Sequence, residues 1–126
     1  FKKSLTDTIK LYKKEGIDII IISQPPLLRF IPESIYFNAK KNNNSIKNYS
    51  INREDFNRIE RVYKNIFIKN ISDIIFIDSS DILCGQTNCD VGSKNSSYYY
   101  DDDHLSSFGA TLYKSRLESA ISYQIE

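Results

Sequence analysis

The stretch Gly16-Ile-Asp-Ile-Ile-Ile-Ile22, followed by Ser23-Gln-Pro-Pro26, decides the fold class of this chain. Its β-branched residues run almost continuously instead of alternating with polar ones, as in a strand that is covered on both faces of a sheet. The prolines end the strand because they cannot donate a hydrogen bond to a sheet ladder. We therefore predict a buried strand over 17–22. The loop over 23–32, at its carboxyl end, either rims a ligand cleft or is an ordinary proline-rich turn.

Helical patterns flank this strand. Residues 2–15 place apolar side chains three or four positions apart, and Gly16 follows as a helix stop. Further along, Asn52 is a capping residue, and a second helical pattern runs from it to about Lys69. The apolar faces of the two predicted helices are Phe1, Leu5, Ile9 and Tyr12, and Phe56, Ile59, Tyr63, Ile66 and Phe67.

A second β-branched run, Ile74-Ile-Phe-Ile77, follows the second helix. Strands joined through a helical crossover pair in parallel with a right-handed connection, so we expect 17–22 and 74–77 to be neighbours. The alternation of helix and strand predicts the α/β class. Because two strands make only a small sheet, we also expect one edge to be exposed or paired with another copy of the chain.

The length of 126 residues suits one compact domain, and we treat 1–126 as a single domain. Residues 31–48 show little periodicity and include the polar tract Lys40-Lys-Asn-Asn-Asn-Ser45, so a flexible polar loop is predicted over 38–50. The 17 Lys and Arg residues nearly balance the 16 Asp and Glu residues, which argues against nucleic acid or anionic lipid as a partner. No apolar run is long enough to span a membrane.

The chemistry concentrates in Tyr98-Tyr-Tyr-Asp101-Asp-Asp-His104-Leu-Ser-Ser-Phe-Gly-Ala110, which holds the only histidine of the chain. A carboxylate three residues before a histidine, within one tight turn, can accept a hydrogen bond from Nδ1. That bond fixes the tautomer and leaves Nε2 facing outward as a base. Asp101 and His104 are therefore candidate catalytic residues. The alternative is a solvated acidic turn beside a histidine that starts a helix.

A last helix is predicted after this turn. Ser106 can cap it, and Gly109 allows its first turn to approach a neighbouring segment closely. Such a helix would hold His104 in place. Its inner face is expected to be Ala110, Tyr113, Leu117, Ala120 and Ile121.

The string Tyr100-Asp-Asp-Asp-His-Leu-Ser106, followed by Gly109-Ala110, resembles the C-terminal block of SGNH hydrolases. It is most similar to that of the SGNH domains fused to membrane acyltransferases. The resemblance implies that Asp101 and His104 are the Asp and His of a Ser-His-Asp triad. It also implies a partial flavodoxin-like fold, a three-layer α/β sandwich with parallel strands.

Other parts of the triad scheme do not occur in the sequence. The Gly-Asp-Ser block that carries the family's nucleophile and its Gly-x-Asn block are absent from the 126 residues. We therefore expect the chain to be the C-terminal part of a larger SGNH domain and to be nearly inactive by itself. Ser79 and Ser80 follow the second strand, but no glycine precedes Asp78, and we interpret both serines as turn residues.

Cys84 and Cys89 are the only cysteines, and the four residues between them make an interval that a disulfide-closed turn can accommodate. The acyltransferase-fused SGNH domains are similar here too, with a cysteine pair ahead of the D-x-x-H block. We favour the disulfide, which implies an oxidising compartment. The alternatives are free cytosolic thiols and a zinc site, which would find barely three ligands in this pair and His104.

The resemblance implies an O-acyltransferase or esterase that moves an acyl group, acetyl being the expected one, to or from carbohydrate hydroxyls of cell-surface glycans. Its partners would be an acyl donor, a glycan acceptor and the upstream part of the same polypeptide, and neither a cofactor nor a metal is expected. The domain would lie on the extracytoplasmic side, tethered to the membrane by upstream segments. The alternative from another class is a noncatalytic α/β interaction module stabilised by the disulfide.

Overall fold

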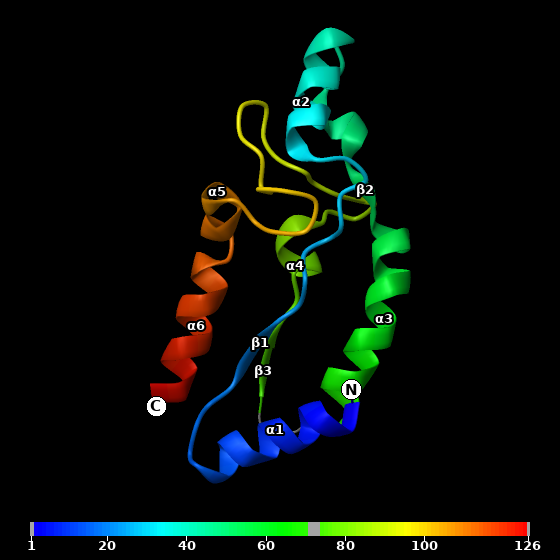
Figure 1. The fold of residues 1–126 in the computed structure, drawn as a ribbon. Coiled ribbons are helices and arrows are strands. Elements are labelled where there is room, and N and C mark those ends of the chain that lie inside the picture. The colour runs from blue at the N-terminus through cyan, green and yellow to red at the C-terminus, as the bar shows by residue number, and fades with distance from the viewer. Residues whose placement is uncertain (1, 71–73, 126) are drawn as a thin grey trace.

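A computed structural model describes residues 2–70 and 74–125, and Figure 1 shows two strands at the centre with helices around them. None of the helices in these residues combines the length and the apolar character needed to cross a bilayer. One element, η1, is a 3₁₀ helix. In chain order the elements are α1 (Lys2–Lys14), β1 (Ile20–Ile22), α2 (Pro32–Lys41), η1 (Ile46–Tyr49), β2 (Ile51–Asn52), α3 (Arg53–Asn70), β3 (Ile75–Ile77), α4 (Ser80–Leu83), β4 (Asn88–Cys89), α5 (Ser107–Thr111) and α6 (Lys114–Ile125).

Strands β1 and β3 form a parallel pair in which Ile20 faces Ile75 and Ile22 faces Ile77. The Ser23 N–H donates to the Ile77 carbonyl at 2.9 Å, which extends the pairing past the end of β1. Helices α3 and α6 lie on either side of the pair in Figure 1, and α6 packs on β3. The α/β class and the parallel pairing are therefore confirmed, in a partial flavodoxin-like arrangement with helices on both sides of the strands.

Strand β1 is shorter and more exposed than the sequence predicts. It covers three residues instead of 17–22, and Ile22 is 46% exposed, whereas Ile77 on β3 is only 6% exposed. The prediction of a strand buried on both faces is wrong. Within the described residues β1 pairs only with β3, so its surroundings cover it incompletely.

The local signals correctly predict the end of α1 and the start of α3. Helix α1 is followed by Gly16, whose φ of 74° lies in the left-handed region that suits glycine. The Asn52 Oδ1 atom accepts the backbone N–H groups of Glu54 at 2.9 Å and Asp55 at 3.2 Å, so it caps α3. On the predicted apolar faces, Ile9 and Phe56 are buried, Leu5 is half-buried, and Tyr12 and Ile59 are exposed; the side chains of Phe1, Tyr63, Ile66 and Phe67 lie outside the described part.

Residues 38–50 are not the loop that the sequence predicts. The end of α2 and the whole of η1 lie within this range. Pro32 occupies the first turn of α2, and Ile35 and Ala39, four positions apart, are buried on one side of the helix. These few apolar positions give too weak a periodicity to stand out among the polar residues, which is why the pattern misses the helix.

The predicted last helix is divided into α5 and α6. Ser106 caps α5, as predicted, because its Oγ atom accepts the Gly109 N–H at 3.0 Å. The helical path breaks between the two elements, so the predicted inner residues do not share one face. Those that are buried or partly buried are Tyr113, Leu117 and Ala120, and those that are exposed are Ala110 and Ile121.

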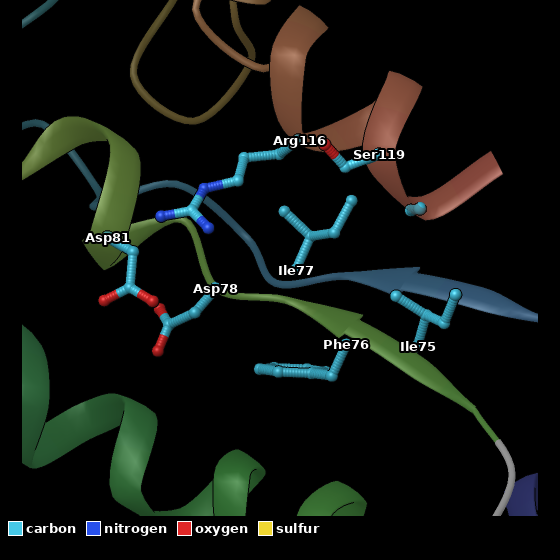
Figure 2. Close-up of a pocket in the computed structure, with 8 residues that line it drawn as sticks. Ile75, Phe76, Ile77, Asp78, Asp81, Arg116 and Ser119 are labelled. Atoms are coloured by element: carbon cyan, nitrogen blue, oxygen red, sulfur yellow. The ribbon is translucent and has the colours of Figure 1, made fainter. Parts of the chain in front are cut away.

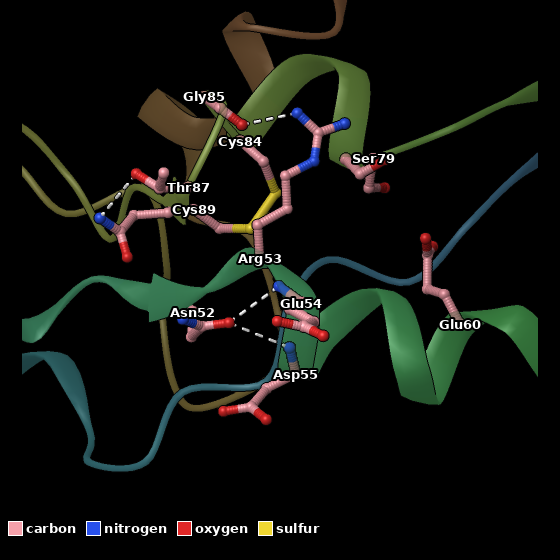
Figure 3. The surroundings of a disulfide bond; sticks show 12 residues. Asn52, Arg53, Glu54, Asp55, Glu60, Ser79, Cys84, Gly85, Thr87 and Cys89 are labelled. Carbon is pink, nitrogen blue, oxygen red and sulfur yellow. Dashed lines mark hydrogen bonds between the residues drawn. A yellow bond between two sulfur atoms is a disulfide. The ribbon is translucent and has the colours of Figure 1, made fainter.

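Cys84 and Cys89 form a disulfide bond, which confirms the prediction and overturns the zinc and free-thiol alternatives. Figure 3 shows the bond beside the start of α3. Cys89 pairs antiparallel with Ile51 of β2, and the Arg53 Nη1 atom donates to the Gly85 carbonyl at 2.6 Å. The disulfide loop is thereby attached to the segment that leads into α3.

The buried core joins the strands to the segment that precedes the acidic turn. It brings together one residue each of β3, α2, α4 and α6, one residue of the loop after β1, one residue between α5 and α6, and two residues between the disulfide loop and the turn. The cluster consists of Leu28, Ile35, Ile77, Leu83, Val91, Tyr99, Tyr113 and Ala120. Stability of the core is therefore coupled to the position of the acidic turn.

Ile77→Ala should lower the free energy of unfolding by about 2–4 kcal/mol, because it leaves a cavity in the core. Its register partner Ile22, which is half-exposed, is the matched control, and Ile22→Ala should cost less than about 1 kcal/mol. Urea denaturation followed by circular dichroism measures both values. Equal losses for the two variants would contradict the observed burial of the sheet.

Candidate active site

The backbone folds Asp101 to His104 into a tight turn around one carboxylate oxygen. The Oδ1 atom of Asp101 accepts the backbone N–H groups of Asp103 at 3.0 Å and of His104 at 2.8 Å. The Tyr100 N–H donates to the His104 carbonyl at 2.8 Å and closes the base of the turn. These bonds are local, so the D-x-x-H spacing itself places the carboxylate beside the imidazole.

The imidazole of His104 is paired with Asp101 through Nδ1. Nδ1 lies 2.9 Å from Oδ2 and 3.1 Å from Oδ1 of Asp101. When Nδ1 carries the proton and donates a hydrogen bond to the carboxylate, Nε2 is the ring nitrogen left to accept a proton. The side chain of His104 is 74% exposed, so a reacting group can reach it. The structure thus brings together both residues that the sequence singles out.

The electrostatics of the turn favour a charged carboxylate and a basic imidazole. The backbone N–H groups of Asp103 and His104 lower the pKa of Asp101 to about 2. The hydrogen bond with Asp101 raises the pKa of His104, and the charges of Asp101 and Asp103 raise it further. Asp101 is therefore ionised at neutral pH and stabilises the protonated form of His104.

The loop over 23–32 holds the turn from one side. The Leu28 N–H donates to the Asp102 carbonyl at 2.8 Å, and Leu28 itself is buried in the core. At the start of the loop, the Ser23 Oγ atom accepts the Ser79 N–H at 2.8 Å. The carboxyl ends of β1 and β3 and the acidic turn are therefore connected through this one loop.

Helix α5 holds the turn from the other side. Ser106 donates through Oγ to the Ser97 carbonyl at 2.7 Å while it caps α5. Gly109 lies against Tyr98, and a Cβ atom added to Gly109 would meet the Tyr98 carbonyl oxygen at 1.9 Å. The predicted close approach at Gly109 is thus observed, and it packs the first turn of α5 against the residues before the D-x-x-H turn.

Ser79 and Ser80 are buried and engaged within the chain. Ser79 is 0% exposed and donates through Oγ to the Ser23 carbonyl, and Ser80 donates through Oγ to Asp78 Oδ1 at 2.7 Å. The Nζ atom of Lys64 contacts the carboxylates of Asp78 and, at 2.8 Å, of Glu60. These contacts support the interpretation of the serines as turn residues.

The positive charge of Lys64 prevents Lys64 from acting as a base toward Ser80. Burial lowers the pKa of Lys64, but the hydrogen bonds with Asp78 and Glu60 outweigh it, so the pKa is raised. Lys64 therefore stays protonated and cannot remove a proton from Ser80. The sequence analysis does not predict this cluster, although the spacing of Glu60 and Lys64 by four residues on a helix is a signal for their pairing.

Besides a hollow of about 380 Å³ lined by Lys64, Asp78 and Ser80, two others adjoin these elements. One, of about 350 Å³, lies between β3 and α6, and Figure 2 shows Arg116 reaching from α6 toward Asp81 and Asp78, with the apolar side chain of Ile77 to one side. A wider groove of about 610 Å³ is lined by residues of α2 and by Tyr100 and other residues around the acidic turn. The lining of this groove includes Tyr100 and Ser106, which flank the acidic turn in the sequence, whereas the lining of the hollow between β3 and α6 includes no residue next to the turn.

Among the described residues, one group has metal-ligating atoms close together, namely Asp101, Asp103 and His104, within 4.8 Å of one another. A metal ion there would have to displace the hydrogen bond between Nδ1 and Asp101. The group is already explained by that bond, and we assign no metal to it. The expectation of a site without metal or cofactor stays a prediction.

Gly109→Ala should destabilise the protein by about 1–3 kcal/mol, because the new methyl group meets the Tyr98 backbone and forces α5 away. The control is Gly85→Ala, where the nearest atom, the Asn88 carbonyl oxygen, lies at an ordinary 3.7 Å. Thermal unfolding compares the two. A Gly109→Ala variant as stable as Gly85→Ala would show that the close approach does not exist in solution.

Comparison with known proteins adds the family. Residues 1–119 match the family model described as SGNH domain (fused to AT3 domains), and this range includes Asp101, His104 and the disulfide. No curated protein and no solved structure gives a significant match. Because the family model covers nearly the whole chain, including the D-x-x-H turn with its paired imidazole, the chain belongs to the SGNH domains that are fused to AT3 domains.

Proposed function

We propose that the chain supplies the Asp and His of a Ser-His-Asp triad that moves an acyl group, acetyl being the expected one, to or from carbohydrate hydroxyls of cell-surface glycans. Membership of its family indicates a function of the acyltransferase or esterase type. The observation that carries the proposal is the 2.9 Å contact between His104 Nδ1 and Asp101 Oδ2 on an exposed turn. A paired, exposed imidazole is what a general base requires.

In the proposed reaction, Nε2 of His104 takes the proton of a serine hydroxyl as its oxygen attacks the acyl carbonyl. Asp101 stabilises the imidazolium that forms, and His104 then returns the proton to the leaving alcohol. A sugar hydroxyl or water next attacks the acyl-serine and gives its proton to His104, which passes it to the serine oxygen. Hydrolysis and transfer differ only in this second acceptor, and the fusion to AT3 domains favours transfer.

The serine and the oxyanion donors would come from outside these 126 residues. The sequence contains no Gly-Asp-Ser string, and both serines after β3 are buried and hydrogen bonded. We assign the nucleophilic serine and the oxyanion donors to the upstream part of the same polypeptide. The disulfide and the fusion to membrane domains support an extracytoplasmic position.

A noncatalytic interaction module is the competing proposal. It would be favoured by a His104 side chain without a carboxylate partner. The contact with Asp101 supports the catalytic proposal instead, because a binding scaffold has no need to fix one tautomer of an exposed imidazole.

Asp101→Asn, made in the protein that also carries the AT3 domains, should lower acyl transfer by about 10⁴-fold, and His104→Ala should lower it by about 10⁶-fold. In the unsubstituted protein the rate should fall as the pH drops through the raised pKa of His104, because protonated imidazole cannot accept a proton. Asp90→Asn, at an exposed aspartate away from the turn, is the control and should keep full activity. Full activity of His104→Ala would refute the proposed function.

The 126-residue chain by itself should not hydrolyse a simple aryl ester, because it contains no triad serine. The measurement is absorbance of the released phenol against a buffer blank. Turnover that disappears in His104→Ala would show that the chain contains its own nucleophile and would overturn this part of the proposal.

A further inference from the structure

A second carboxylate lies against the same nitrogen of His104. The Oδ1 atom of Asp103 is 2.8 Å from Nδ1, as close as either oxygen of Asp101. The side chains of Asp101 and Asp103 are 37% and 36% exposed, so both are partly withdrawn from solvent beside the ring. The D-x-x-H pattern accounts only for the first of them.

The two carboxylates do not contact the ring in the same way. Only the oxygens of Asp101 lie in the direction of a hydrogen bond from Nδ1, whereas Asp103 makes an ion-pair contact. Asp101 is also fixed by two backbone N–H groups, which leave its carboxylate little freedom to turn. Direction at Nδ1 is therefore supplied by Asp101, and Asp103 adds negative charge at short range.

We propose that Asp103 is a positioning residue whose carboxylate stabilises the protonated ring of His104 by charge, while Asp101 sets the orientation of the ring. This inference rests on the proposed function, since stabilisation of the imidazolium matters for a base that becomes charged in each acyl-transfer step. The interaction grows as the proton arrives at Nε2, so it favours the charged state over the neutral one. A merely structural Asp103 would not discriminate between the two states.

Asp102 provides the matched comparison. It lies in the same turn and carries the same charge, but its contact with the surroundings is through its backbone carbonyl, which accepts the Leu28 N–H. The charges that face His104 are those of Asp101, Asp103 and Asp102, and Asp102 contributes least to the raised pKa of the ring. Asp103→Asn and Asp102→Asn each remove one negative charge with an isosteric side chain. A difference between them therefore reports the closeness of Asp103 to the ring and not the change in net charge.

The experiment is an NMR titration of the ring protons of His104 in the 126-residue chain, where a single histidine makes the assignment unambiguous. Asp103→Asn should lower the pKa of His104 by at least twice the shift seen in Asp102→Asn, and high salt should reduce the difference. Asp103→Ser repeats the test if the Asn variant does not fold. Equal shifts in Asp103→Asn and Asp102→Asn would overturn the proposal.

A kinetic readout separates this inference from the proposed function. In the protein that also carries the AT3 domains, Asp103→Asn should move the acid limb of the rate profile to lower pH. It should also lower the plateau rate, because the imidazolium that forms in each step loses a stabilising charge, whereas Asp102→Asn should change both quantities less. An inactive parent protein would refute the proposed function, yet the NMR titration would still decide the role of Asp103. If Asp103→Asn lowers the pKa of His104 in the NMR titration but leaves the acid limb of the rate profile unchanged, Asp103 affects His104 only in the free protein. Its proposed part in the reaction is then refuted.

Discussion

The Asp101 carboxylate, held by the backbone N–H groups of Asp103 and His104, is the constraint on which the candidate site depends. These N–H groups lower the pKa of Asp101 to about 2, so an ionised carboxylate lies beside Nδ1 of His104. Because the turn makes these bonds within four residues, the pair needs no distant element to form. Distant elements are needed to fix the position of the turn in the fold.

Three segments fix the position of the turn. The loop after β1 reaches the turn through the bond from the Leu28 N–H to the Asp102 carbonyl, and α5 reaches it through the close approach of Gly109 to Tyr98. The disulfide loop fixes the chain that runs toward the turn. The exposed imidazole is thus carried by a turn whose preceding chain is anchored in the core by Tyr99. A surface loop held in this way can keep the geometry that catalysis demands.

Features encoded by neighbouring residues could be predicted from the sequence, and features set by distant packing could not. The caps at Asn52 and Ser106, the stop at Gly16 and the pairing of Asp101 with His104 are local and follow from residue type and spacing. The exposure of Ile22, the break between α5 and α6, and the contact of Lys64 with Asp78 depend on which surfaces meet in three dimensions. Helix α2 is not predicted because its apolar positions are too few to give a clear periodicity.

The most direct test of the central claim is the tautomer of His104, read from the ¹⁵N chemical shifts of its ring at a pH above its pKa. The pairing described here predicts that the proton resides on Nδ1, facing Asp101, and that Asp101→Ala shifts the population toward the Nε2-protonated form. A ring that already carries its proton on Nε2 in the unsubstituted chain would mean that Asp101 does not direct the imidazole in solution. It would contradict the account.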